Sequence, residues 1–302
     1  MHFAVNEAES KVRRRIEQTT KVPDFMLYPR RAYWRLSEGR LIVDGRNWLD
    51  DLAGQLGKYS ILKKGQLGGV TSRTMLYVIR YSSGDYKIVV KELAKSKALK
   101  WAMLGLCAAP IKGFRIDPLL QLGSEYKAIR HVRTLGLHSP IIEAVVLDKR
   151  LLVTRFVEGM TLADVIRDCI RVKGGDLSLI REAGAQIAKI HINGATLGNI
   201  KPKNIIVSGK DLYFTDIEQF IFGAGDPAWD IGQFIGWSLK STRNSIMAAT
   251  KTKEFLKGYV SIGDPSNITR LAKSNRCVQS FYPVLAPTIA QTIKKEIKAI
   301  AN

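Results

Sequence analysis

Five polar side chains stand at the ends of predicted secondary-structure elements, where a folded chain can present them to a ligand. Lys91 closes an apolar strand, and Glu125 comes early in the helix that follows. Asn204 precedes a predicted hairpin, Asp216 ends it, and Asp230 lies in the first turn of the next helix. A lysine ammonium can neutralise phosphate charge, and Asp and Asn oxygens are ligands that Mg²⁺ prefers. Each residue alone is also an ordinary strand, helix or turn residue, so only their order is informative.

Strand-forming runs come first along the chain and helical periods come later. The expected strands cover residues 59–69, 73–81, 86–93, 141–148 and 150–159, with a later hairpin over 203–216. The expected helices cover residues 118–136, 162–172, 179–194 and segments of 229–302. This segregation predicts an α+β fold with a small antiparallel β lobe and a larger helical lobe.

We expect three regions along the chain. Residues 1–57 form an N-terminal extension with a helical stretch near its end, and residues 58–157 form the β lobe. This lobe carries an insertion at 95–117, whose lysines surround an apolar stretch; it either packs on the domain or contacts lipid or a partner. Residues 158–302 form the helical lobe.

The composition is that of a globular protein with an excess of positive charge. Apolar residues are 46% and charged residues 25% of the 302, which excludes a disordered or collagen-like chain. The net charge of +20 favours an anionic partner, although a lysine-rich solvated surface explains it equally well. Three cysteines far apart predict neither a zinc site nor a disulfide framework, and we expect a cytoplasmic protein without a transmembrane segment.

No P-loop, HExxH or GxSxG motif occurs, but the five residues and the motifs around them form an ordered set. The set comprises Val-Val-Lys at 89–91, Glu125, Gly-Asn-Ile-Lys-Pro-Lys-Asn at 198–204, Thr-Asp-Ile-Glu at 215–218, and Gly-Asp-Pro-Ala-Trp-Asp at 225–230. This order resembles the protein-kinase-like superfamily, which implies a two-lobed fold that binds ATP and Mg²⁺. The short interval between Asp216 and Asp230 resembles its compact branch, the RIO kinases and the KEOPS kinase, and Gly-Asp-Pro-Ala-Trp-Asp-Ile is similar to aminoglycoside phosphotransferases.

The resemblance assigns nucleotide-binding roles in the first lobe. Lys91 would hold the α- and β-phosphates, with Glu125 as its ion-pair partner. The glycines in the first strand turn would close over the phosphates, although their spacing is not GxGxxG; they are Gly65, Gly68 and Gly69. Residues Thr154 to Glu158, including Phe156, would line the adenine site through backbone groups.

In the second lobe, the resemblance makes Asn204 and Asp216 the Mg²⁺ ligands and gives Asp230 a structural role, binding the backbone of the catalytic loop. Lys201 belongs to that loop. The proton-accepting aspartate of the family is replaced by Asn199, and Leu197 replaces the usual histidine.

An amide cannot accept a proton, so the base must be lost or replaced. Asn199 could still orient a hydroxyl through its carboxamide oxygen. His191 is a possible substitute base, although a packed structural histidine is the simpler interpretation. Glu218, which stands where the family has glycine, could supply a carboxylate near the metals.

Three functions are compatible with these motifs. The first is an ATP- and Mg²⁺-dependent phosphotransferase of the atypical Ser/Thr protein kinase type, acting on a protein substrate or within a partner complex and weakened by Asn199. The second is a nucleotide-binding pseudokinase that works as a scaffold or switch. The third is a protein that binds RNA or ribonucleoprotein through the basic residues outside the motifs; small-molecule kinases are a further alternative.

Overall fold

The chain divides into two compact units in a computed structural model. The structure describes residues 33–54, 58–67, 73–93, 114–171, 177–223, 225–240, 242–274 and 285–301. What we call the sheet unit comprises Met1–Lys100, Arg115–Lys127 and Pro140–Phe156. The helical unit comprises Trp101–Phe114, Ala128–Ser139 and Val157–Asn302.

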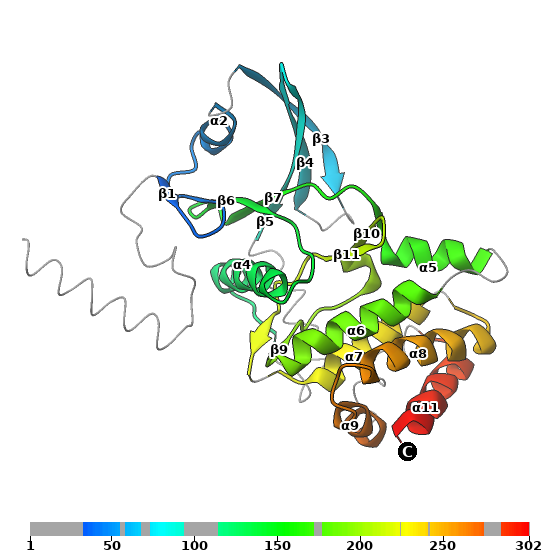
Figure 1. The fold of residues 1–302 in the computed structure, drawn as a ribbon. Helices are drawn as coiled ribbons and strands as arrows, with labels where there is room; N and C mark the ends of the chain where they lie inside the picture. The colour runs from blue at the N-terminus through cyan, green and yellow to red at the C-terminus, as the bar shows by residue number, and fades with distance from the viewer. Residues whose placement is uncertain are drawn as a thin grey trace, which may run out of the picture. The chain divides into compact units, whose positions relative to one another are not determined.

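A seven-stranded sheet forms the sheet unit, in the order β1-β2-β6-β7-β5-β4-β3 (Figure 1). Its strands are β1 (Tyr33–Arg35), β2 (Arg40–Ile42), β3 (Tyr59–Leu67), β4 (Thr74–Tyr81), β5 (Gly84–Glu92), β6 (Ile142–Val146) and β7 (Leu151–Arg155). The five strands expected from periodicity are all present. The sheet is antiparallel except between β2 and β6, which run parallel.

One face of this sheet is covered by a short helix, α2 (Trp48–Ala53). Trp48 and Leu52 pack with apolar side chains of the sheet, among them Ile88 and Val90 of β5. Because successive side chains of a strand point to opposite faces, Lys91 of β5 is directed to the other face. The hydroxyl of Tyr59 donates to Asp50 at 2.7 Å, which ties α2 to β3.

Helix α4 (Pro118–Thr134) supplies Glu125 and has local start and stop signals. The Asp117 carboxylate accepts from the N–H groups of Leu119 and Leu120 at 2.8 and 2.9 Å, and Pro118 occupies the first helical position. The helix ends before Gly136, whose φ of +69° is a conformation that glycine adopts without steric cost. Its first ten residues belong to the sheet unit and the rest to the helical unit.

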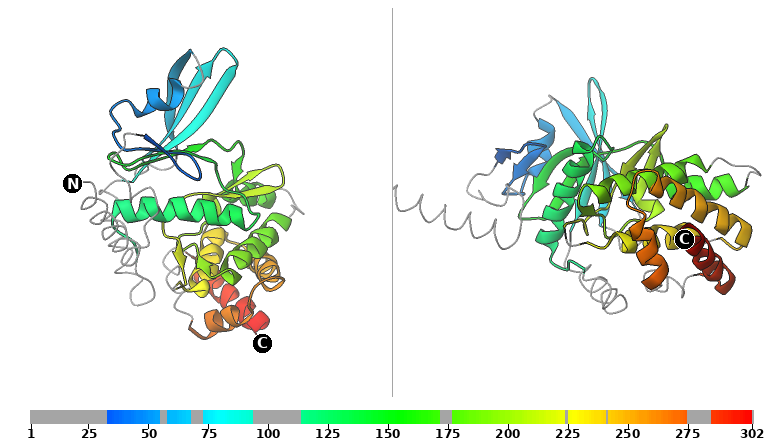
Figure 2. Two further views of the ribbon diagram at one scale, coloured as in Figure 1. Left: turned by 60° about the vertical axis from the view of Figure 1, so that its left-hand side comes forward. Right: turned by 60° about the horizontal axis from the view of Figure 1, so that its bottom comes forward.

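Six helices make up most of the described part of the helical unit. They are α5 (Leu162–Arg171), α6 (Ser178–Ile192), α7 (Pro227–Leu239), α8 (Ser245–Val260), α9 (Ser266–Ser274) and α11 (Pro287–Ala301). Helix α8 packs against both α6 and α11, and Figure 2 shows these helices side by side in both views. At the α6–α8 contact, a Cβ added to Gly184 or Gly258 would come closer than 3.0 Å to a backbone carbonyl of the facing helix. The two glycines therefore allow the close approach of α6 and α8.

Short strands complete the helical unit. The predicted hairpin is present as β10 (Ile205–Ser208) and β11 (Asp211–Phe214), and β8 (Met160–Thr161) extends it. A second small sheet pairs β9 (Ala195–Thr196) with β12 (Ile221–Phe222). The pairing of β9 with β12 brings the segment before the β10–β11 hairpin next to the segment after it.

The predicted α+β fold, with a sheet-rich part followed by a helical part, is confirmed. Within the described residues, none of the helices combines the length and apolarity that crossing a membrane requires. Most of the predicted 95–117 insertion and residues 1–32 of the N-terminal extension lie outside the described residues.

Candidate functional site

The predicted site residues divide into two sets, one in each unit. In the sheet unit, Lys91 Nζ lies 2.7 Å from Glu125 Oε2, and the two side chains are 9% and 4% exposed. This joins β5 to α4 across 34 residues of sequence. A buried ion pair of this kind costs desolvation free energy that an apolar pair would not, so it is weak evidence for a purely stabilising role.

The other nucleotide-site predictions in this unit fall on β3 and β7. Gly65 lies inside β3 at an irregularity in its pairing with β4, not in the turn between them, and its φ is +156°. Gly68 and Gly69 lie outside the described residues.

At the predicted adenine segment, Thr154 is buried in β7 and pairs with Val89 of β5. The N–H of Phe156 donates to the carbonyl of Lys87 at 3.0 Å. Lys87 Nζ also lies 5.8 Å from the centroid of the Phe156 ring. The Phe156 N–H is therefore committed to the sheet, so a nucleotide would have to use other backbone groups of this segment.

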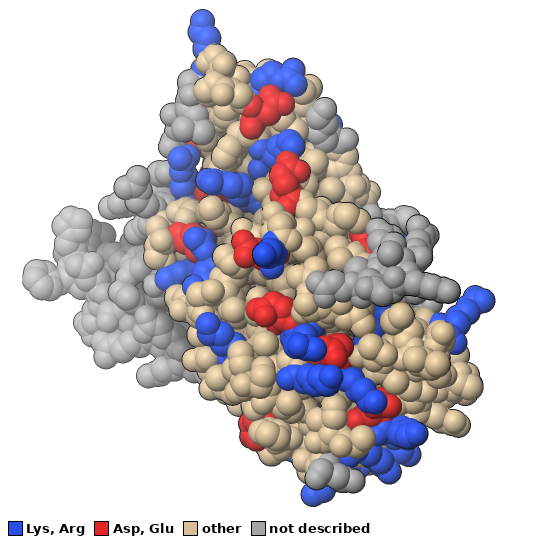
Figure 3. Space-filling model, turned by 45° about the vertical axis from the view of Figure 1, so that its right-hand side comes forward, with Lys and Arg blue, Asp and Glu red and all other residues tan. Residues whose placement is uncertain are grey.

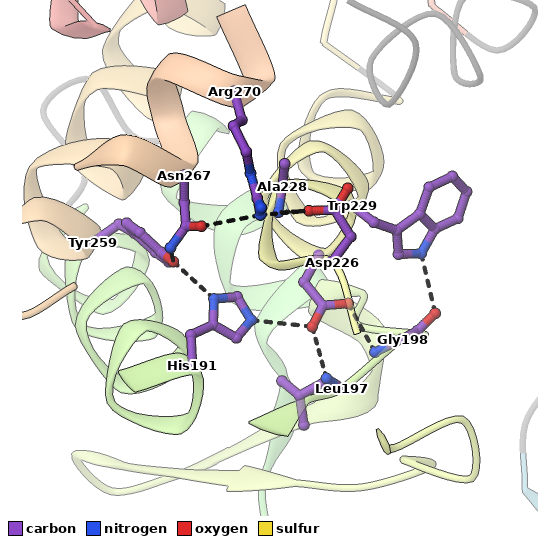
Figure 4. A network of polar contacts seen from close by, with 10 residues as sticks. His191, Leu197, Gly198, Asp226, Ala228, Trp229, Tyr259, Asn267 and Arg270 are labelled. Carbon is purple, nitrogen blue, oxygen red and sulfur yellow. Dashed lines mark hydrogen bonds and ion pairs between the residues drawn. The ribbon is translucent and has the colours of Figure 1, made fainter. Parts of the chain in front are cut away.

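In the helical unit, the loop at 197–204 is held by the N-terminal turns of α7. The two carboxylate oxygens of Asp230 accept from the N–H groups of Leu197 and Gly198, at 2.6 and 2.7 Å. Figure 4 labels these two donors. The indole N–H of Trp229 donates to the Gly198 carbonyl at 3.2 Å. Gly198 has a φ of +71°, which favours glycine there. The predicted structural role of Asp230 thus has the expected contacts.

Helix α7 begins at a well-defined cap. The Asp226 side chain accepts from the N–H of Ala228 at 3.0 Å, and Pro227 follows at the first helical position. Arg270 of α9 donates to the same Asp226 oxygen at 2.8 Å. These contacts fix the register of α7, and therefore the position of Asp230.

His191 connects this carboxylate to α8. Its Nε2 lies 3.1 Å from Asp230 Oδ2, and its Nδ1 lies 2.8 Å from the hydroxyl of Tyr259. Asn267 Nδ2 in turn donates to that hydroxyl at 3.1 Å. One consistent set of protons satisfies the chain: Asn267 donates to Tyr259, Tyr259 to His191, and His191 to Asp230. Burial raises the pKa of the Tyr259 hydroxyl, so it stays protonated. His191 is therefore a buried side chain that links α6 to Asp230 of α7 and to Tyr259 of α8.

The far end of the loop meets the hairpin. Asn204 donates its Nδ2 to the Asn199 carbonyl at 3.0 Å, which leaves its Oδ1 as the side-chain oxygen available to a ligand. The N–H and hydroxyl of Thr215 both donate to the Asn204 carbonyl, at 2.8 and 2.9 Å. Asn204 and the neighbouring Asp216 are thereby brought to the same end of the β10–β11 hairpin.

Asp216 has a left-handed backbone conformation, with a φ of +54°. This region is uncommon for residues other than glycine, asparagine and aspartate, and it concentrates at functional sites. The donor chemistry of Asp216 and Asn204 fits a hard divalent cation. Among the residues that the structure describes, no three His, Cys, Asp or Glu side chains form a cluster.

Two further predicted residues, Asn199 and Glu218, are almost completely buried, at 3% and 2% exposure. Asn199 occupies the bend between Gly198 and the 3₁₀ turn η3 (Pro202–Asn204). Glu218 follows Asp216 in the turn after β11. Both side chains are therefore shielded from water, one in the loop before the hairpin and one in the turn after it.

Trp237 is a residue of this site that was not predicted from the sequence. Lys201 is 8% exposed, and its Nζ lies 4.7 Å from the centroid of the Trp237 ring. Trp237 stands seven residues after Asp230 on α7, so both side chains project from the same face of the helix. This spacing was the signal in the sequence that could have found it.

The surface charges outside the site are mixed on the face seen in Figure 3, where Lys and Arg alternate with Asp and Glu. The exposed face of α11 is different. Lys294, Lys295 and Lys298 are exposed there, while Glu296 is buried. The exposed face of α11 therefore carries lysines without acidic residues, unlike the mixed surface in Figure 3.

Comparisons with known proteins give a structural neighbour only. No family model matches the chain. No curated protein matches it either. Among solved structures, the chain is similar to "Amicoumacin kinase hAmiN in complex with AMP-PNP, Ca2+ and Ami", with a TM-score of 0.41 and 9% identity, covering 78% of this chain and 87% of that one.

Proposed function

We propose that this protein is an ATP-dependent phosphotransferase of the protein-kinase-like superfamily. The observation that carries the proposal is the buried pair of Lys91 and Glu125, at 2.7 Å. Such a pair is expensive to bury, and a fixed ammonium is what the phosphates of ATP require. The loop held by Asp230 and the left-handed Asp216 support the same assignment from the helical unit.

The roles follow from the chemistry of each side chain. Lys91 binds the phosphates, and Glu125 keeps its ammonium in place. Asn204 and Asp216 hold Mg²⁺, which neutralises phosphate charge when bound. Asn199 orients the acceptor hydroxyl through its carboxamide oxygen. We infer a protein Ser/Thr hydroxyl as the acceptor, as in the compact RIO- and KEOPS-like kinases that the motif order resembles.

A second candidate is a pseudokinase that binds Mg·ATP without transferring phosphate. Asn199 favours it, because the position of the proton acceptor holds an amide. General-base catalysis contributes about 10²–10⁴-fold, so its loss reduces turnover without affecting nucleotide binding.

Transfer from Mg·ATP and the thermal shift that Mg·ATP causes distinguish the two. The variants are Asn199→Asp, Lys91→Ala and Asp216→Ala, with Lys149→Ala as an exposed-lysine control in the sheet unit. We expect Lys91→Ala and Asp216→Ala to lose transfer, and Asn199→Asp to raise it by about 10²-fold or more. A wild-type chain that is stabilised by Mg·ATP but transfers nothing would support the pseudokinase. A chain with no Mg·ATP response would contradict both.

An RNA or ribonucleoprotein partner is a separate proposal, supported by the exposed lysines of α11. Binding through phosphates would weaken steeply as salt is added. We therefore expect RNA affinity to fall with salt, and to fall less in a variant with Lys294, Lys295 and Lys298 changed to Gln. RNA binding that ignores salt would contradict this partner.

A further inference from the structure

A chain of hydrogen bonds runs from Arg270 of α9 to the carboxylate of Asp230. Arg270 Nη2 donates to Asn267 Oδ1 at 3.1 Å, and Asn267 Nδ2 donates to the Tyr259 hydroxyl at 3.1 Å (Figure 4). That hydroxyl lies 2.8 Å from His191 Nδ1, and His191 Nε2 lies 3.1 Å from Asp230 Oδ2. Side-chain exposure falls from 57% at Arg270 to 0% at Asp230. The chain therefore connects the surface of the helical unit with its interior.

The two ends of this chain fix the direction of every hydrogen bond in it. A guanidinium only donates, so Asn267 must turn its oxygen to Arg270 and its amide nitrogen to Tyr259. At the other end, both oxygens of Asp230 accept backbone N–H groups, which is the arrangement of a carboxylate. A carboxylate only accepts, so His191 carries its proton on Nε2. The one proton of the Tyr259 hydroxyl is then directed to His191 Nδ1. The direction that follows from Arg270 agrees with the direction that follows from Asp230.

Arg270 also contacts the start of α7 directly. It donates at 2.8 Å to Asp226, the capping residue four positions before Asp230. Helix α9 therefore contacts the first turn of α7 and, through the chain, the carboxylate that this turn presents. Because that carboxylate accepts from Gly198, a shift of Asp230 also moves the adjacent Asn199.

We propose that Arg270 and Asn267 are positioning residues of the loop at 197–204, acting through this directed chain. Their effect on phosphate transfer rests on the proposed function, in which Asn199 of the loop orients the acceptor hydroxyl. A loop that is held less well then lowers turnover more than nucleotide affinity. The direction of the chain is independent of that function, since it follows from the donors and acceptors alone.

The ¹⁵N chemical shifts of His191, measured in the full chain, test the direction because they distinguish a protonated ring nitrogen from a bare one. In the wild type, we expect a proton on Nε2 and none on Nδ1. Asn267→Asp offers Tyr259 only acceptors, so the hydroxyl donates to the new carboxylate and His191 holds protons on both nitrogens.

Asn244→Asp is the matched control, because Asn244 caps α8 through its side-chain oxygen, which a carboxylate also supplies. It should leave the shifts of His191 unchanged. A wild-type His191 with its proton on Nδ1, or an Asn267→Asp variant without a proton there, would overturn the directed chain.

Hydrogen exchange of the Leu197 and Gly198 amides measures how firmly the loop is held, without requiring activity. We expect Arg270→Met to accelerate this exchange about fivefold, and Arg270→Lys, which still donates and cannot accept, to restore most of the protection. Arg167→Met is the control, since Arg167 belongs to an ion pair of α5 and its side chain is also 57% exposed. Equal exchange in Arg270→Met and Arg167→Met would overturn the positioning role.

Transfer kinetics separate this inference from the proposed function. In a wild type that transfers phosphate, Arg270→Met should lower kcat about fivefold and leave the KM for Mg·ATP unchanged. A change in KM alone would overturn an action through the loop. If the wild type transfers no phosphate while the shifts and the exchange behave as expected, the proposed function fails and the positioning role of Arg270 and Asn267 stands.

Discussion

The Lys91 ammonium lies 2.7 Å from the Glu125 carboxylate, with both side chains shielded from water. Neither group can be removed alone without leaving the other charge buried. Glu92, the residue after Lys91 in β5, belongs to an exposed ion pair instead. Its carboxylate pairs with Arg73, and the Glu92 and Arg73 side chains are 35% and 50% exposed. The loss of a glutamate can therefore be compared between a buried ion pair and an exposed one.

Glu125→Ala should destabilise the protein by about 3–5 kcal/mol, because it removes the carboxylate that lies 2.7 Å from the buried Lys91 ammonium. Glu92→Ala is the control and should cost about 1 kcal/mol or less, since exposed pairs contribute little. Urea unfolding followed by circular dichroism measures both. Similar losses for the two variants would contradict the burial argument.

Tyr259→Phe should lower the free energy of unfolding, because Tyr259 belongs to the hydrogen-bond chain that supports the loop at 197–204 through His191 and Asp230. The variant leaves Asn267 Nδ2 without its acceptor and His191 Nδ1 without its donor, a loss of about 1–3 kcal/mol. Tyr213→Phe is a matched control in the same unit, where the centroid of the tyrosine ring lies 5.1 Å from that of His138. Equal stability of the two variants would show that the chain does not support the loop.

Most of the longer elements could be predicted from the sequence, because their periods are long enough to read. Strands β3 to β5 are runs of eight or nine residues that include β-branched and aromatic residues, and α6 keeps a helical spacing over fifteen. Strands β1, β2, β8, β9 and β12 span only two or three residues, too few to show a period. The pairing of β2 with β6 joins residues about a hundred positions apart, which no local pattern indicates.

The site residues likewise include some that could be predicted from the sequence and some that were missed. Asp230 was predictable because a capping Asp and a Pro precede it and fix its place in the first turn of α7. The contact of Lys201 with Trp237 was missed, although the position of Trp237 seven residues after Asp230, on the same face of α7, was a signal for it. Gly65 was expected in a turn, but the long β3 continues through it with a bulge.

Gly258→Ala tests the contact of α6 with α8. The added methyl group would meet the backbone carbonyl of Arg181, and backbone cannot rotate away as a side chain can. We expect destabilisation of about 3 kcal/mol, the upper end for overpacking. Gly54→Ala is the control, because the nearest atom to its Cβ lies 3.8 Å away and its φ is −63°. This control should change stability by about 0.5 kcal/mol or less. A neutral Gly258→Ala would mean that the helices do not require this close approach.

Thr161→Val tests the start of α5. The Thr161 hydroxyl accepts from the N–H of Asp164 at 3.1 Å and donates to its carboxylate at 2.6 Å, a reciprocal capping arrangement. We expect a loss of about 1 kcal/mol at neutral pH. Thr292→Val is the control, since its hydroxyl donates to the Thr288 carbonyl of its own helix at 2.8 Å.

The pH dependence of this loss tests whether the hydrogen bond from Thr161 to the Asp164 carboxylate contributes to it. The hydrogen bond from Thr161, helped by Arg167, lowers the pKa of Asp164 below its ordinary value. Because the folded pKa is the lower one, the stabilisation is complete above the unfolded pKa and disappears as pH falls through the folded one. The gap in unfolding free energy between wild type and Thr161→Val should therefore narrow below about pH 4, while the gap for Thr292→Val stays constant. A Thr161→Val gap that does not change with pH would mean that the hydroxyl acts on the backbone N–H alone.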